Sequence, residues 1–141
     1  MVRVNLINPK HLADQHLIGE YNEILMLLGY VRKYPNPEKI PEKYCLGKGH
    51  IKFFKNKLKY LILRHELIKK EMKKRNFETN VTINLSGFPK NLIQDWIPSK
   101  NDFKIIKERI IWKLNKKPDY YRYCGKKKNK EFLIKLIETA D

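Results

Sequence analysis

The chain has 141 residues, and 42% of them are hydrophobic, which suits one domain with a buried core. Its 31 lysines and arginines outnumber its 15 aspartates and glutamates, so the formal net charge is +16. A charge so far from neutral favours a polyanionic partner, above all nucleic acid. The alternative is a basic protein from a lysine-rich proteome, in which the charge has no binding role.

The sequence also argues against several classes of protein. It contains no run of about 18 apolar residues, so we expect no membrane-spanning segment. We find no secretory signal at the N-terminus. Cys45 and Cys124 lack the spacing of a zinc site. We therefore expect an intracellular protein in a reducing compartment, the cytosol or nucleus, without a metal site.

The first predicted helix follows Asn8 and Pro9, which suit a helix cap and the first helical position. Its period continues to about Val31. One side carries a buried apolar stripe, formed by Leu17, Tyr21, Ile24, Leu25 and Leu28.

Another side of this helix carries His16, Glu20 and Glu23, at the spacing i, i+4, i+7. The simplest interpretation is a solvated polar face that pairs with lysines. A metal site is the weaker alternative, because no second helix supplies a matching set of ligands.

Residues 33–49 hold three prolines and two glycines and are predicted to form a loop. A second helix is predicted from His50 to Lys74. Residues 77–98 have no helical period and form an irregular connection, with a helical turn near 89–94. The sequence thus predicts an all-α single domain with long irregular loops.

Ser99 and Asp102 form a capping-box pattern that opens a third helix over residues 100–116. Three cations repeat on one face of this helix at i, i+4, i+8: Arg109, Lys113 and Lys117. Residues 118–130 interleave tyrosines with basic residues, a composition suited to stacking on bases and holding phosphates. The alternative is a hydrophobic cap on the core followed by a solvated lysine run. Residues 131–141 favour a short terminal helix.

Several segments resemble the pyrimidine-dimer DNA glycosylase family, the phage endonucleases that excise ultraviolet photoproducts. The N-terminal "RVNL" and "LADQHLIGEYNE" resemble that family's first segments, and "LGKGHIKFFKNKLKYL" over 46–61 resembles its second-helix region. "DWIP" over 95–98 and "KPDYYRYCGK" over 117–126 resemble later segments in the same order. The resemblance covers residues 1–126, which we take as the glycosylase-like domain, and leaves 127–141 as a basic C-terminal extension.

The resemblance implies a nucleophile that is not a side chain. In this family the α-amino group exposed by removal of the initiator methionine attacks the damaged nucleotide, and here that group belongs to Val2. Glu23 matches the catalytic carboxylate. The implied fold is all-α with three principal helices and the N-terminus near the catalytic helix, and the implied enzyme acts as a monomer without a cofactor.

The resemblance also implies an activity on damaged double-stranded DNA: N-glycosylase action on cyclobutane pyrimidine dimers, followed by strand cleavage through β-elimination. The family has arginine where this chain has Asn22 and Met26. Two alternatives therefore remain, an enzyme for other damaged bases or abasic sites, and a DNA-binding protein without catalysis. The side chains expected to contact the substrate or DNA are Arg3, Gln15, His16, Asn22, His50, Arg109, Lys113, Lys117, Tyr121, Arg122 and Lys126.

Overall fold

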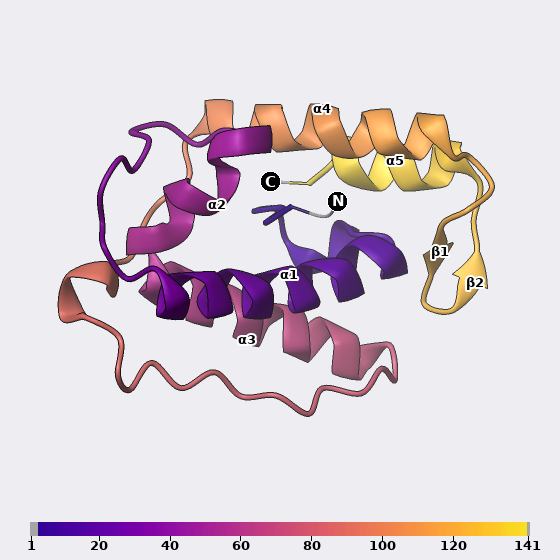
Figure 1. The fold of residues 1–141 in the computed structure, drawn as a ribbon. Helices are drawn as coiled ribbons and strands as arrows, with labels where there is room; N and C mark the ends of the chain where they lie inside the picture. Colours follow the sequence, from indigo (N-terminus) through magenta and orange to yellow (C-terminus); the bar gives the residue numbers. More distant parts are fainter. Residues whose placement is uncertain (1–2, 141) are drawn as a thin grey trace.

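The computed structural model describes residues 3–140 and contains five α-helices and one short β-hairpin within them (Figure 1). The helices are α1 (Asp14–Lys33), α2 (His50–Phe53), α3 (Leu58–Lys74), α4 (Lys100–Lys116) and α5 (Lys130–Glu138). The hairpin pairs β1 (Arg122–Tyr123) with β2 (Lys126–Lys127). The predicted all-α fold with three principal helices is confirmed, since α1, α3 and α4 are the long helices.

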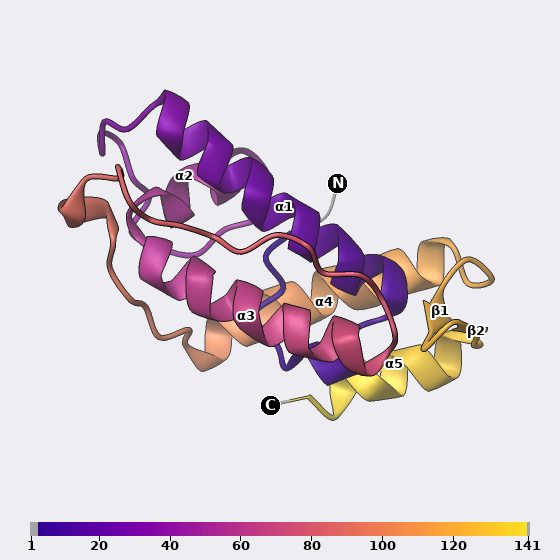
Figure 2. The ribbon, with the colours of Figure 1, turned by 90° about the horizontal axis from the view of Figure 1, so that it is seen from below.

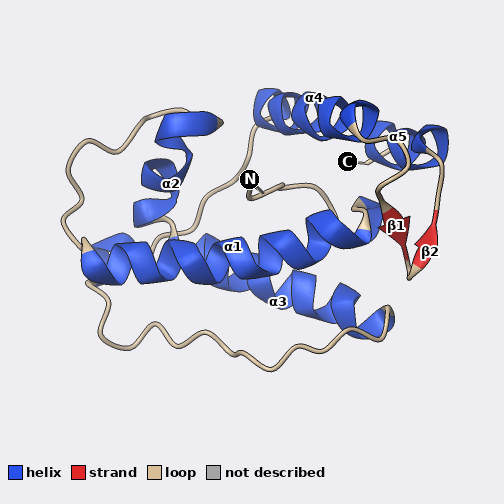
Figure 3. Cartoon of the chain, turned by 45° about the vertical axis from the view of Figure 1, so that its right-hand side comes forward, coloured by secondary structure: helices blue, strands red, loops and turns tan. Residues whose placement is uncertain are grey.

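The helices form two layers, with the N-terminal segment between them. α1 packs against α3 in one layer, and α4 packs against α5 in the other (Figures 1 and 2). The segment from Val4 to Ile7 runs between these layers, and its four side chains are almost completely buried. Long loops join the layers, notably the stretches before α2 and before α4 (Figure 3).

The main chain of this N-terminal segment is held by side chains rather than by a neighbouring strand. Arg64 from α3 donates hydrogen bonds to the carbonyls of Leu6 (3.0 Å) and Ile7 (2.5 Å). Arg75, just after α3, donates to the carbonyls of Leu12 (2.8 Å) and Pro9 (3.2 Å). Buried carbonyl groups need such partners, so these arginines make an extended buried segment possible.

The start of the first helix differs from the prediction. Asn8 and Pro9 open only a short 3₁₀ turn, Pro9–His11, in which the Asn8 side chain accepts from the Lys10 N–H. The chain is then extended at Leu12, and α1 begins at Asp14. The local capping signal was therefore correct for a helical turn and wrong for α1. Between the turn and α1, the Leu12 carbonyl accepts from Arg75 instead of from a helical N–H group.

The predicted helix from His50 to Lys74 is interrupted. α2 passes into a 3₁₀ turn, Phe54–Asn56, and α3 begins after Lys57, whose ψ of 40° is not helical. Phe53 and Phe54 lie before this break with helical backbone angles, and both rings pack edge-on against Trp96.

Three further predictions are confirmed. α4 begins at the predicted capping box, in which the Asp102 N–H donates to Ser99 Oγ (3.2 Å) and the Ser99 N–H to Asp102 Oδ2 (2.8 Å). A 3₁₀ turn occupies Lys90–Leu92, and α5 is the predicted terminal helix.

The β-hairpin was not predicted. It turns through Cys124 and Gly125, whose φ angles of 52° and 79° are left-handed. The Asp14 carboxylate accepts from the N–H groups of both turn residues, at 2.9 and 2.7 Å, and also from Arg75. This carboxylate fastens the hairpin to the start of α1.

Within residues 3–140 no helix is long and apolar enough to cross a lipid bilayer.

Candidate active site

The acidic side of α1 is buried, so its interpretation as a solvated face was wrong. His16, Glu20 and Glu23 are each at most 7% exposed. Glu20 pairs with Arg64 inside the protein, with Oε2–Nε at 2.6 Å and Oε1–Nη2 at 2.9 Å. Glu20 is therefore a structural carboxylate, while Glu23 borders a cavity.

The Glu23 cavity has a volume of about 380 Å³ and lies where α1 meets the N-terminal segment and the start of α2. Its lining residues are Arg3, Glu23, Gly47, Lys48, His50 and Ile51. Val2, the expected nucleophile, lies outside the described residues. Arg3, the residue that follows Val2 in the chain, lines this cavity.

Burial raises the pKa of Glu23 above its usual value, while the positive charges of Arg3 and Lys113 act in the opposite direction. A carboxylate in a partly desolvated cavity next to cations interacts strongly with any positive charge that develops nearby. The arrangement suits electrostatic stabilisation and proton transfer.

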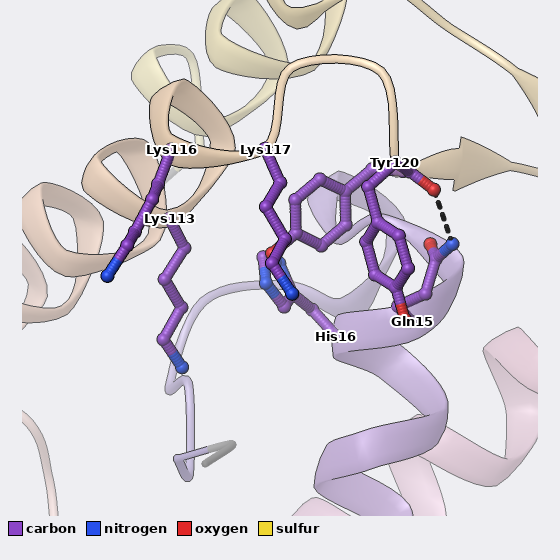
Figure 4. Close-up of a pocket in the computed structure, with 7 residues that line it drawn as sticks. Gln15, His16, Lys113, Lys116, Lys117 and Tyr120 are labelled. Atoms are coloured by element: carbon purple, nitrogen blue, oxygen red, sulfur yellow. Dashed lines mark hydrogen bonds between the residues drawn. The ribbon is translucent and has the colours of Figure 1, made fainter.

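A second cavity, the His16 cavity, has a volume of about 290 Å³ and lies between α1 and the end of α4 (Figure 4). Its lining residues are Gln15, His16, Lys113, Lys116, Lys117, Tyr120 and Tyr121. His16 and Glu23 are seven residues apart on α1, so they lie about 10 Å apart along the helix axis, and each lines one of the two cavities.

His16 is neutral in this setting. Burial, with a smaller effect of Lys113, lowers its pKa to about 3. Its ring packs against Tyr121 with 4.7 Å between ring centroids. Within the described part of the chain, neither ring nitrogen of His16 has a hydrogen-bond partner.

Gln15 fixes the segment that covers this cavity. Its side-chain Nε2 donates to the Tyr120 carbonyl at 3.0 Å (Figure 4). Its Oε1 accepts from the Arg122 N–H at 3.0 Å. Gln15 thus sets the path of the chain beside Tyr121, which is buried, and Tyr120, which is half exposed.

The basic stripe of α4, meaning Arg109, Lys113 and Lys117 just after the helix, is divided in the structure. Lys113 and Lys117 line the His16 cavity, whereas Arg109 lines another cavity beside Trp112. Lys113 reaches toward the N-terminal segment in Figure 4. Burial and the neighbouring Arg3 and Arg109 lower the pKa of Lys113, and Glu23 acts in the opposite direction. Lys113 also lowers the pKa of His16 and His50, so it influences both cavities.

The other predicted contacts are more dispersed. Asn22 is exposed on α1, and Met26 on the same helix is 69% exposed. Arg122 and Lys126 are exposed on the hairpin. His50 is 1% exposed and contacts main-chain groups through both ring nitrogens, so a direct contact with DNA would require it to give up one of these bonds.

Sequence reasoning missed several residues that build this site. Tyr44 is buried and donates to the Val4 carbonyl (3.0 Å), and Arg64, Arg75 and Asp14 hold the N-terminal segment and the hairpin. Their side chains act across 40 or more residues of sequence, so no local pattern marks them. Lys48, which lines the Glu23 cavity, was also missed. The basic composition around the glycines of the 47–49 turn could have suggested it.

Among residues 3–140 no three His, Cys, Asp or Glu side chains are close enough together to hold a metal ion. Cys45 and Cys124 are both free thiols.

Comparison with known families gives this geometry a context. Residues 1–85 match the family described as pyrimidine dimer DNA glycosylase. The matched part includes the N-terminal segment, α1 with His16 and Glu23, the turn with Lys48, and α3. It covers more than half of the 141 residues. The chain therefore belongs to the pyrimidine dimer DNA glycosylase family, and this membership indicates a DNA-repair glycosylase with DNA as its substrate.

Proposed function

We propose that the protein excises cyclobutane pyrimidine dimers from duplex DNA and then cleaves the strand at the resulting abasic site. The nucleophile is the α-amino group of Val2 after removal of Met1. The observation that carries the proposal is Glu23, a buried carboxylate at a cavity that Arg3 also lines.

The amine fits this chemistry. An α-amino group has a reference pKa of about 7.7–8.0, so a useful fraction is neutral near pH 7. Retention of Met1 would displace the amine by one residue, about 3.8 Å between Cα atoms. We therefore propose that the active protein begins at Val2.

We propose that the reaction proceeds in two steps. The neutral amine forms a bond to C1′ of the damaged nucleotide, and the electrons of the glycosidic bond leave with the base. The amine gives up two protons, one to the departing base and one to O4′ as the C1′–O4′ bond breaks and the sugar ring opens, and an imine to C1′ results. This imine acidifies the C2′ proton. Removal of that proton expels the 3′ phosphate oxygen by β-elimination and cuts the strand.

Glu23 has two roles in this proposal. Its carboxylate stabilises the positive charge that develops on the sugar, and it accepts and returns protons. The cations of a basic protein bind the DNA phosphates, but they cannot stabilise the positive charge on the reacting sugar. That charge requires an anion, and Glu23 supplies it in this proposal. No step requires a metal or an organic cofactor.

The basic stripe on α4, together with the hairpin cations Arg122 and Lys126, is proposed to bind the phosphate backbone. To reach C1′ the enzyme moves a nucleotide out of the stack, which costs a few kcal/mol and less at a damaged step. The neutral ring of His16 and the edge of Tyr121 then face the displaced nucleotide.

The exposed Asn22 and Met26 favour a second candidate, the same chemistry on a different lesion. Neither side chain carries a charge, although both lie on α1, the helix that carries Glu23. An enzyme without cations there would bind the phosphates beside the lesion less tightly. A panel of duplexes with a dimer, a ring-opened purine or an abasic site separates the two candidates.

The test is covalent trapping. Purified protein is mixed with ultraviolet-irradiated duplex or with abasic duplex in the presence of borohydride, and intact mass identifies the first residue. We expect an adduct on both substrates, located on Val2 by peptide mapping and unaffected by chelator. An adduct only on abasic DNA would favour the second candidate. No adduct from a chain that begins at Val2 would contradict both and favour a binding protein without catalysis.

A further inference from the structure

Both main-chain polar groups of Val4 are held by buried side chains, one from the loop before α2 and one from the first residue of α2. The Val4 N–H donates to Nε2 of His50 at 3.0 Å, and the Val4 carbonyl accepts from the Tyr44 hydroxyl at 3.0 Å. Val4 itself is fully buried. We call the Tyr44 hydroxyl and the His50 imidazole the Val4 clamp.

The protonation state of His50 follows from its contacts. Nδ1 lies 2.9 Å from the Cys45 carbonyl, which can only accept, so we assign the ring proton to Nδ1. Nε2 is then the acceptor that the Val4 N–H requires. Burial lowers the pKa of His50 to about 4, so the ring is neutral at physiological pH.

Tyr44 is equally constrained. Its ring is 3% exposed and packs against Phe53, Phe54 and Trp96, with ring centroids about 6 Å apart. Burial raises the pKa of its hydroxyl, so the hydroxyl remains a donor. The aromatic cluster around the ring fixes the position of the hydroxyl that holds Val4.

The backbone of the same loop is tight at Gly49. A Cβ at this position would lie 2.8 Å from Sγ of Cys45 and 3.4 Å from Pro41. Glycine therefore allows the chain to pass close to Cys45 immediately before His50. The loop is shaped to present His50 and Tyr44 to one point of the N-terminal segment.

We propose that Tyr44 and His50 are positioning residues that place the α-amino group of Val2 against Glu23. This inference rests on the proposed function. The Cα atoms of Val2 and Val4 are two chain steps apart, at most about 7 Å, so fixing Val4 restricts where the amine can be. A displacement of about 1 Å in a reacting group can slow a reaction about 100-fold. Neither residue needs to contact DNA for this role.

Three variants test the proposal. Tyr44→Phe removes only the hydroxyl, and His50→Leu removes the acceptor for Val4. His50→Gln offers an amide oxygen near the position of Nε2. Tyr30→Phe is the matched control, because it removes a hydroxyl from a ring on α1 that packs against Tyr34. Intact mass first verifies that each protein begins at Val2.

The measured quantities are the rate of borohydride-trapped adduct formation at saturating protein, the Kd for an abasic-analogue duplex, and the thermal midpoint. In Tyr44→Phe and His50→Leu the α-amino group is still present but is held less firmly. We therefore expect the trapped adduct to form at least about 10-fold more slowly in these two variants. Their Kd should stay near that of the unchanged protein, and His50→Gln should recover part of the rate. Hydrogen exchange at the Val4 amide should quicken in His50→Leu without any DNA.

Specific results overturn the proposal. Faster exchange at Val4 with an unchanged trapping rate would show that the clamp does not position the amine. A loss of rate that only follows a loss of Kd or of folded protein would show a structural role. Failure of the unchanged protein to form an adduct would overturn the proposed function and this inference together.

Discussion

Glu20 and Arg64 join α1 to α3 through a buried, two-point ion pair, with oxygen–nitrogen distances of 2.6 and 2.9 Å. The same guanidinium holds the carbonyls of Leu6 and Ile7. One side chain thus fixes the packing of two helices and the path of the N-terminal segment.

The first prediction concerns stability. Arg64→Met leaves the Glu20 carboxylate buried without its partner and two carbonyls without their donor. We expect the free energy of unfolding to fall by about 3–5 kcal/mol, as for other broken buried pairs. Urea denaturation followed by circular dichroism measures it. Lys70→Met, at an exposed position of the same helix, should change stability by less than about 0.5 kcal/mol. Similar losses in both variants would contradict the role of the pair.

The second prediction concerns catalysis by Glu23. Glu23→Gln keeps the shape of the side chain and removes its charge and its proton transfer. We expect cleavage of irradiated duplex to slow by about 10²–10⁴-fold, the usual contribution of a general acid or base. Gel electrophoresis of end-labelled DNA measures the rate. Glu66→Gln, which removes a half-exposed carboxylate paired with Lys69 on α3, should retain normal cleavage. Normal cleavage by Glu23→Gln would exclude the proposed role.

The third prediction concerns the stability of the same variant. The pKa of Glu23 is raised in the folded protein, so folding disfavours its charged form. At neutral pH the charge therefore costs stability, and the cost disappears as the pH falls below the ordinary value of 4.5, where the group is protonated in both states. We expect Glu23→Gln to unfold at a higher temperature than the unchanged protein at pH 7, with the difference vanishing near pH 4. A difference of opposite sign would show that the cations around Glu23 outweigh its burial.

The fourth prediction uses Trp112 as a reporter of the proposed DNA-binding face. Its ring is 51% exposed on α4, with the Arg109 guanidinium 5.3 Å and the Lys116 ammonium 4.7 Å from the ring centroid. Duplex DNA bound along the basic stripe should change its fluorescence, and the change should weaken steeply between 50 and 200 mM salt, roughly as phosphate contacts predict. Trp96, packed among Tyr44, Phe53 and Tyr60, gives a constant background.

Trp112→Phe is the control for this measurement, because Trp96 is then the only tryptophan in the sequence. The fluorescence change should disappear in this variant while the salt-dependent affinity, measured by anisotropy of labelled DNA, remains. A change that persists would place the DNA away from α4 or show that binding alters the aromatic cluster.

The sequence predicted best where structure is decided locally. α4 begins and ends at the predicted residues because its capping box and apolar period lie within the helix itself. The predicted start of the first helix and the unbroken helix from His50 to Lys74 were wrong. Before α1 the Leu12 carbonyl binds Arg75, a partner 63 residues away that no local pattern indicates. The hairpin turn requires two left-handed residues, and Cys124 gave no signal of that conformation.

The candidate site divides in the same way. The shared side of His16 and Glu23 follows from helical spacing, and the basic stripe of α4 follows from its period. The burial of that side, the two cavities and the contacts of Val4 depend on segments far apart in the chain. Resemblance to a family pointed to Val2 and Glu23, but it carried no information on Tyr44 or on what holds the N-terminal segment.

The side-chain hydrogen bonds that hold the N-terminal segment also bear on how the protein folds. The bond between Tyr44 and Val4 spans 40 residues of sequence, and the bond between Arg75 and Pro9 spans 66. Closing such loops costs entropy before any contact forms, so proteins rich in distant contacts fold more slowly than helical bundles with local ones. The N-terminal segment is held by Arg64 of α3 and by Tyr44 of the loop before α2, so the cavity beside Glu23 is complete only when these distant contacts have formed.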